Sequence, residues 1–288
     1  MSYRPVSHLL PAQELDMGGT IVKQPLPTQN VERIDPFLLL HHFGPYEVEP
    51  GTDPLDVGPH PHRGFEPVTF LYSGGLRHRD SRGNTGYLQG GDVQWMTSGQ
   101  GIIHSERASQ EFLEAGGTME GIQLWVNLPA AHKMVQPRYQ DVKAAQLQPL
   151  DFGSGVQAKL VAGSFGGKIG PVETYSPLLI IQFELEAGAG LELPLPADFN
   201  AGLYLLDGEL QLNENFNYAG PYLINFKQEG TAIHMKGVAP RTRALLIAGA
   251  PIGEPVTNYG PFVMNTQTEI MEAMRDYQMG KMGFYTEY

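Results

Sequence analysis

Two short stretches of this sequence, His60-Pro61-His62 and His104-Ser105-Glu106, each hold two potential metal ligands one residue apart. On a β-strand, the side chains at positions i and i+2 point to the same face. If both stretches are strands that line one barrel, three imidazoles and one carboxylate converge on one point. The chain has no cysteine, so no thiolate competes with these ligands. The spacing therefore predicts a metal site formed by His60, His62, His104 and Glu106.

Histidine pairs with this spacing also occur by chance in a chain with nine histidines, so the spacing alone does not establish a metal site. Two features favour a real site. Both pairs lie beside glycine-rich segments, at Gly58 and Gly64 and at Gly99 and Gly101, and predicted strands separate them. Binding residues are commonly placed where a rigid strand meets a loop. Four nitrogen and oxygen ligands suit Fe²⁺, Mn²⁺, Ni²⁺, Cu²⁺ or Zn²⁺.

Other histidines carry weaker signals. His41 and His42 are adjacent, so on a strand only one of them can face a cavity, and a packing or hydrogen-bonding role is favoured. His78 and Asp80 could share one face of a hairpin, where a surface hydrogen bond is expected. Phe70 shares the parity of the ligands and is expected either in the core or in the wall of the pocket.

Short strands and turns must position the ligands, because 35 glycines and 23 prolines disfavour long helices. The first half predicts strands at residues 68–72, 93–96 and 120–126, and the second half at 178–185, 203–206, 223–226 and 244–249. The segment Tyr204–Leu210 corresponds to Phe70–Leu76, which indicates a duplicated barrel. The second copy lacks a His-X-His motif and has only His234, so we expect it to be metal-free.

The end of the chain differs from the rest. Thr266 and Glu269 fit a helix capping box, and Ile270, Met274 and Tyr277 share one helical face. The sequence therefore predicts a C-terminal helix at residues 267–279, which packs against a barrel.

Composition excludes several classes of function. A formal net charge of −12 disfavours direct nucleic-acid binding, which needs a basic face. No apolar stretch is long enough to cross a membrane, and the N-terminus does not resemble a signal peptide. These features predict a cytoplasmic protein, and with no obvious interface stripe outside the C-terminal helix we expect a monomer.

Four long motifs in order resemble the pirin family of the cupin superfamily. They are His60–Glu66, Gly91–Thr97, Gly99–Glu106 and Gln123–Leu128, and the segment Pro261–Asn265 with its following helix extends the resemblance to nearly the whole chain. The resemblance implies an all-β fold of two tandem cupin barrels (double-stranded β-helix or jelly roll) with a short C-terminal α-helix. We therefore expect an N-terminal metal-binding barrel at residues 1–142 and a C-terminal barrel at 143–288.

The same resemblance implies one iron, as Fe²⁺, in the N-terminal barrel, with His60, His62, His104 and Glu106 in the positions of the family's ligands. Some members, including bacterial pirins, are associated with quercetin 2,3-dioxygenase activity, so a flavonol and O₂ are the expected substrates. Glu106 would be both ligand and general base. Glu66 has the same parity as His60 and His62, so it is expected beside the ligands as the alternative base.

Two other functions stay open. Pirins are also known as regulators, so the iron could be a redox switch that alters binding to a protein partner such as a transcription factor. A non-oxidative cupin, such as an isomerase that uses Zn²⁺ or Mn²⁺ as a Lewis acid, is the third alternative.

Overall fold

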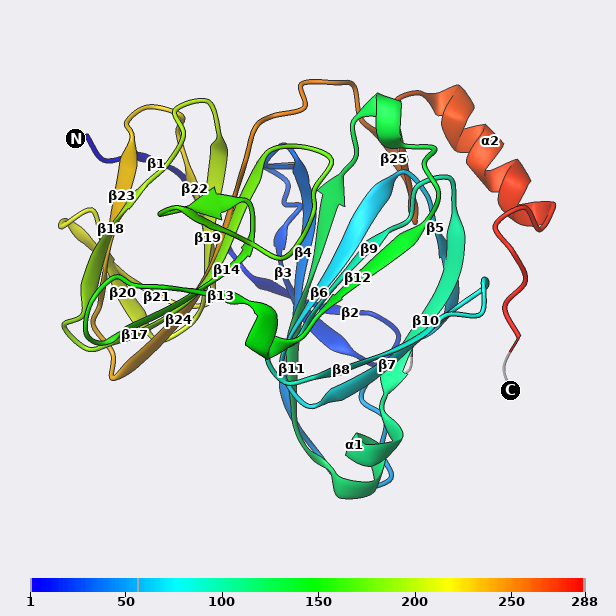
Figure 1. Cartoon of the computed structure of the whole chain (residues 1–288), viewed down its shortest axis with the longest axis horizontal. Coiled ribbons are helices and arrows are strands. Elements are labelled where there is room, and N and C mark those ends of the chain that lie inside the picture. The colour runs from blue at the N-terminus through cyan, green and yellow to red at the C-terminus, as the bar shows by residue number, and fades with distance from the viewer. Residues whose placement is uncertain (1, 56, 287–288) are drawn as a thin grey trace. The chain divides into compact units, whose positions relative to one another are not determined.

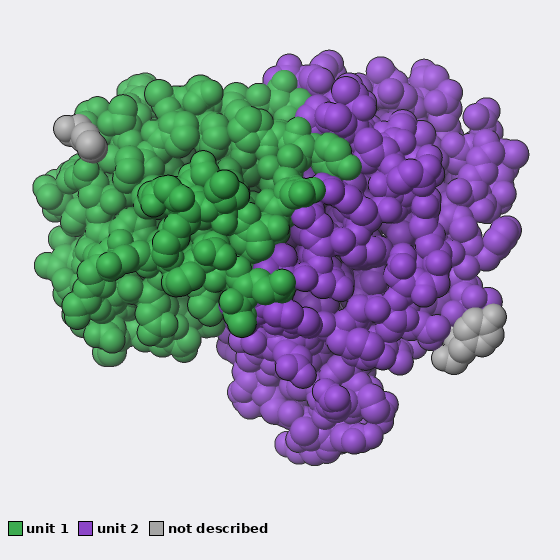
Figure 2. Space-filling view, viewed as in Figure 1, with its two compact units in different colours: residues 1–13, 24–38, 145–252 green, residues 14–23, 39–144, 253–288 purple. Residues whose placement is uncertain are grey.

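The computed structural model describes residues 2–55 and 57–286, and it consists mainly of antiparallel strands (Figure 1). These residues form two compact units, which Figure 2 colours separately. Unit 1 comprises residues 1–13, 24–38 and 145–252, and unit 2 comprises residues 14–23, 39–144 and 253–288. Both units are cupin-type barrels, so the predicted all-β class is confirmed.

Most of unit 2 is built from two antiparallel sheets of described residues. In order across the larger sheet, the strands are β12 (Arg138–Val142), β9 (Val93–Thr97), β6 (Phe65–Ser73), β11 (Gly117–Asn127), β4 (Phe37–Val48), β3 (Ile21–Leu26) and β2 (Gln13–Asp16). The smaller sheet has β5 (Val57–His62), β10 (Ile102–Ala108), β7 (Gly75–Asp80) and β8 (Thr85–Gln89). The smaller sheet carries both predicted ligand pairs.

Unit 1 repeats this plan in its described residues. Its larger sheet has β1 (Val6–Pro11), β22 (Tyr222–Phe226), β19 (Asn200–Asp207), β24 (Arg241–Gly249), β17 (Leu178–Glu186), β14 (Val156–Ala162) and β13 (Gln148–Leu150). Its smaller sheet has β18 (Gly190–Pro194), β23 (Ala232–Gly237), β20 (Glu209–Leu212) and β21 (Phe216–Ala219), and a hairpin is formed by β15 (Ser164–Phe165) and β16 (Lys168–Ile169). The duplication predicted from the sequence is therefore present.

The core of unit 1 is apolar where unit 2 carries its histidines. In the pair β18–β23, Leu191 lies opposite Met235 and Leu193 opposite Ile233, and all four side chains are buried. This pair occupies the place in unit 1 that β5–β10 occupies in unit 2. Apolar side chains cannot ligate a metal, so this core favours the prediction of a metal-free second barrel.

Two α-helices complete the described part of the chain. The predicted C-terminal helix is α2 (Gln267–Gln278), and the capping box between Thr266 and Glu269 is present. The sequence analysis did not anticipate α1 (Gln110–Ala115), a six-residue helix capped by Ser109. Among the described residues, no helix has the length and apolar character that crossing a bilayer requires.

The C-terminal residues pack in an unexpected place. The sequence analysis assigns residues 253–288 to the second barrel, whereas the structure groups them with unit 2, which holds the histidine pairs. They include the short hairpin β25 (Thr257–Tyr259) and β26 (Phe262–Met264). The buried Lys133 fixes this segment, since its Nζ donates to the Val263 carbonyl (3.1 Å), the Gly64 carbonyl (2.8 Å) and Asn127 Oδ1 (2.7 Å).

Candidate metal centre

Strand β5 presents His60 and His62 to the inside of unit 2. Its sequence alternates proline and histidine, and prolines at positions 59 and 61 cannot donate ladder hydrogen bonds. Accordingly, β5 is an edge strand whose neighbour in its sheet is β10. The chain then turns at Gly64, whose φ of 88° suits glycine, and an added Cβ would lie 2.0 Å from the Val263 carbonyl oxygen.

Strand β10 places the second candidate ligand pair beside the first. His104 lies directly opposite His60 in the antiparallel ladder, and Ile102 lies opposite His62. The register shifts between His104 and Glu106, so that Glu106 lies opposite Val57. Cross-strand partners point to the same face of a sheet, which is why residues 42 positions apart or more along the chain meet here.

The three imidazoles form one cluster. The ligand nitrogens of His60, His62 and His104 all lie within 4.8 Å of one another. The Nε2 atoms of His60 and His62 are 3.1 Å apart, and the rings of His60 and His104 have centroids separated by 4.3 Å. Among the described residues this is the one group of three or more His, Cys, Asp or Glu side chains with the spacing of metal ligands.

Burial prepares these imidazoles to bind a metal. It lowers the pKa of His62 and of His104 well below the ordinary histidine value, and the nearby His60 lowers both pKa values further. Both rings are therefore neutral near pH 7 and have lone pairs to donate. In addition, His104 Nε2 is buried and has no hydrogen-bond partner among the residues described. A buried imidazole nitrogen without a protein partner is suited to coordinate a metal ion.

Glu106 lines the same cavity, although it is not one of the three clustered residues. Thr69 Oγ1 donates to its Oε1 over 3.2 Å, and Gln123 Nε2 donates to its Oε2 over 2.9 Å. Thr69 and Gln123 are partners in the β6–β11 ladder and so share a face. The carboxylate is thereby held at the wall of the cavity that His60 and His62 also line.

The cavity has a volume of about 450 Å³ and mostly apolar walls. Its polar lining comprises Thr20, His41, His60, His62, Thr69, Glu106 and Gln123. Its apolar lining includes Val22, Leu39, Phe43, Leu55, Val57, Leu76 and Trp125. The indole ring of Trp125 lies edge-on to His62, with ring centroids 5.4 Å apart. A mainly apolar molecule with a few polar groups matches these walls.

Glu66 does not reach this cavity, which differs from the sequence prediction. Strand β6 presents Thr69 to the cavity, so Glu66, an odd number of residues away, faces the opposite side of the sheet. There it is buried and accepts a hydrogen bond from Thr97 Oγ1 at 2.6 Å. Phe70 points the same way as Glu66 and is a core residue. The parity argument failed because the turn at Gly64 separates β5 from β6.

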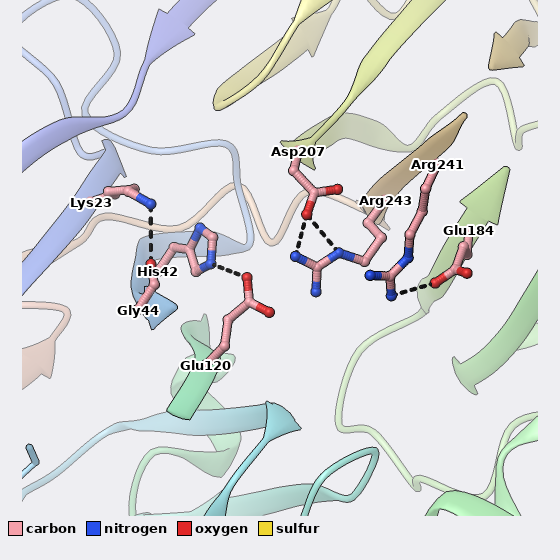
Figure 3. Close-up of polar contacts among 8 residues, drawn as sticks. All are labelled: Lys23, His42, Gly44, Glu120, Glu184, Asp207, Arg241 and Arg243. Atoms are coloured by element: carbon pink, nitrogen blue, oxygen red, sulfur yellow. Dashed lines mark hydrogen bonds and ion pairs between the residues drawn. The ribbon is translucent and has the colours of Figure 1, made fainter. Parts of the chain in front are cut away.

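Of the adjacent residues His41 and His42, which the sequence analysis gave little weight, one lies at the site. His41 lines the cavity, and burial lowers its pKa to about 4. Its neighbour His42 faces away and forms a hydrogen bond with Glu120, 3.2 Å from Nε2 to Oε1 (Figure 3). Only one of the adjacent pair faces the cavity, as predicted.

His78 is the more consequential omission, because the sequence analysis expected it at the surface and it is buried. Its Nδ1 lies 3.3 Å from His104 Nδ1, and its Nε2 lies 2.8 Å from the Tyr139 hydroxyl. Strand β7 places it opposite Glu106, on the ligand face of the smaller sheet. The sequence shows which residues of β7 share a face, but it does not show that β7 pairs with β10.

Comparisons with known proteins agree with this architecture. The sequence model of the Pirin family matches residues 19–126, and that of the Pirin C-terminal cupin domain matches residues 180–283. A Pirin-like protein of Solanum lycopersicum is 39% identical over 283 residues, which cover 97% of this chain and 92% of the relative. Human Pirin is 35% identical over 280 residues, with 96% and 92% coverage.

A solved structure is also similar over nearly its whole length. The crystal structure of quercetin 2,3-dioxygenase from Acinetobacter baumannii superposes with a TM-score of 0.93 at 35% sequence identity. The match covers 98% of this chain and 99% of that chain.

Proposed function

Because the chain belongs to the pirin family, we propose that it is a metal-dependent dioxygenase that acts on a flavonol such as quercetin. The observation that carries the proposal is the cavity that His60, His62 and Glu106 line together with apolar and aromatic side chains, with His104 clustered against the two histidines. Among the comparisons, the similarity to a solved quercetin 2,3-dioxygenase supports the proposal.

In this proposal His60, His62, His104 and Glu106 hold one divalent metal, with Fe²⁺ as the ion that the family resemblance implies. The donor set fits, since it consists of three imidazoles and a carboxylate, and one buried imidazole nitrogen lacks any other partner among the described residues. Once bound, such a metal supplies a centre at which a substrate oxygen and dioxygen come together and electrons pass between them.

The side chains of the cavity then have separate tasks. Trp125, Phe43 and Leu76 exclude water and pack against the flat rings of the substrate. Glu106 accepts the proton of the flavonol hydroxyl at a carboxylate oxygen, and Thr69 and Gln123 keep that carboxylate in place. Glu66 is on the other face of β6, so we assign the base role to Glu106 alone.

His78 is expected to strengthen metal binding without touching the metal. Metal-ligating histidines commonly hydrogen-bond through the second ring nitrogen, which fixes the ring's orientation and tautomer. His78 provides that partner for His104. We expect His78→Phe to weaken metal binding about 10- to 100-fold, the usual cost of losing such a partner. Competition with a chelator measures this change directly.

The control for His78→Phe is the same substitution at the exposed His8 of β1, which should leave metal binding unchanged. If His78→Phe retains metal as tightly as the natural sequence does, its contact with His104 has no role in holding the ligand.

The proposed function is tested by measuring the metal content of protein purified without chelator, followed by anaerobic addition of quercetin and then oxygen. We expect about one metal per chain and an oxygen-dependent loss of the flavonol absorbance. A chain that binds metal but leaves quercetin unchanged would contradict the dioxygenase proposal and favour the alternative of a redox-sensing regulator. A chain that binds no metal after reconstitution would contradict the ligand assignment itself.

A further inference from the structure

The C-terminal segment, residues 260–285, contacts the chain directly after the first ligand pair. Gly260 and Pro261 line the cavity. The Arg63 amide donates to the Pro261 carbonyl over 3.4 Å, and the Val263 amide donates to the Arg63 carbonyl over 3.0 Å. Because Arg63 follows His62, these backbone hydrogen bonds join the C-terminal segment to the residue directly after β5.

The same segment also contacts the back of the second ligand pair. Ser105 lies between His104 and Glu106 and so points to the opposite face of β10, where its Oγ is 2.5 Å from the Tyr285 hydroxyl. Next to it, Ile103 packs in a buried cluster with Ile270 and Met282. The C-terminal segment therefore covers the outer face of the strand whose inner face carries the ligands.

An ion pair between the buried Arg63 and the partly buried Asp276 adds to these contacts. Both terminal nitrogens of Arg63 lie 3.1 Å from Asp276 Oδ2 on α2, and Arg63 Nε donates to the Gln100 carbonyl over 2.7 Å. Arg63 is only 4% exposed, so Asp276 supplies the charge that a buried guanidinium needs. Gln100 lies in the turn that leads into β10. One arginine thus joins the end of β5, the start of β10 and α2.

We infer that the C-terminal segment is a positioning element of the metal centre, and that its docking and metal binding stabilise each other. The inference rests on the proposed metal site. Strand β5 is an edge strand whose prolines cannot donate hydrogen bonds, so the sheet alone holds it weakly. The C-terminal segment supplies the missing support on the outside while the ligands converge on the inside. Coupling of this kind is reciprocal, so metal must also tighten the segment.

Two variants remove polar contacts of the segment and leave its apolar packing intact, although Asp276→Asn also removes the ion pair of Asp276 with Lys281. Tyr285→Phe removes the hydroxyl that meets Ser105, and Asp276→Asn removes the charge that meets Arg63. The matched control is Tyr259→Phe, a tyrosine that is 59% exposed. We expect each of the two variants to bind Fe²⁺ about 10-fold more weakly under anaerobic competition with a chelator, within the usual range of coupling between two sites. The control should bind as the natural sequence does.

Hydrogen exchange of the natural chain tests the reciprocal effect and does not depend on the folding of any variant. Amides of residues 262–285 should exchange about 10-fold more slowly with Fe²⁺ bound than without it. Unchanged exchange despite bound metal, or Fe²⁺ affinities equal to that of the natural chain in both variants, would overturn the inference and leave the metal site standing. A natural chain that binds no Fe²⁺ would overturn both.

Discussion

Replacing His62 with alanine is expected to abolish metal retention and, with it, turnover of quercetin. His62 is 2% exposed, its Nε2 lies 3.1 Å from that of His60, and its ring packs against Trp125. Loss of a side chain that only supports a ligand weakens metal binding about 10- to 100-fold, so loss of a ligand should cost at least about 100-fold. Metal analysis after gel filtration and oxygen uptake with quercetin measure the two effects.

The matched control is His8→Ala, since His8 is an exposed histidine on β1. Circular dichroism separates metal loss from unfolding, because His62→Ala also leaves a void beside Trp125. Full turnover by a folded His62→Ala protein would show that the chemistry takes place elsewhere. Turnover lost with metal retained would mean that His62 contacts the substrate and is not a ligand.

Strand parity predicted which side chains of the candidate ligand set share a face, because it was applied within single strands. His60 and His62 share β5, and His104 and Glu106 share β10, so alternation alone places each pair on one face. The same rule failed for Glu66 and Phe70, which the turn at Gly64 carries into another sheet. Parity has no meaning across such a turn, and Gly64 was a local signal that the strand ends before Glu66.

Long-range pairing accounts for the other differences. The sequence shows that His78 can share a face with Asp80, but only the pairing of β7 with β10 brings it to His104. Likewise, the strands and the capping box at Thr266 were predictable because they depend on local pattern. The docking of α2 against the ligand strands depends on Arg63 and Asp276, which are 213 positions apart. No local signal links residues so distant in the chain.

Replacing Glu66 with glutamine is expected to stabilise the protein at alkaline pH and to leave its stability at acid pH unchanged. Burial raises the pKa of Glu66 from 4.5 to about 7, although the hydrogen bond from Thr97 opposes the increase. Between these two pH values the folded chain keeps a proton that the unfolded chain has lost. Stability from this group is therefore complete below pH 4.5 and is lost as the pH rises through 7. The loss amounts to about 3 kcal/mol, at about 1.4 kcal/mol per pH unit.

Glutamine has the shape of the protonated acid and carries no charge at any pH, so Glu66→Gln escapes this loss. Its free energy of unfolding in urea should match that of the natural sequence at about pH 3.5 and exceed it by about 3 kcal/mol at about pH 8.5. Glu14→Gln, at an exposed carboxylate on β2, should show no such divergence. A constant difference at both pH values would mean that folding does not raise the pKa of Glu66.

The same variant also separates two roles for this residue. A carboxylate on the far side of β6 should be dispensable for turnover, whereas a loss of about 100-fold, the scale of a missing general base, would return Glu66 to the chemistry.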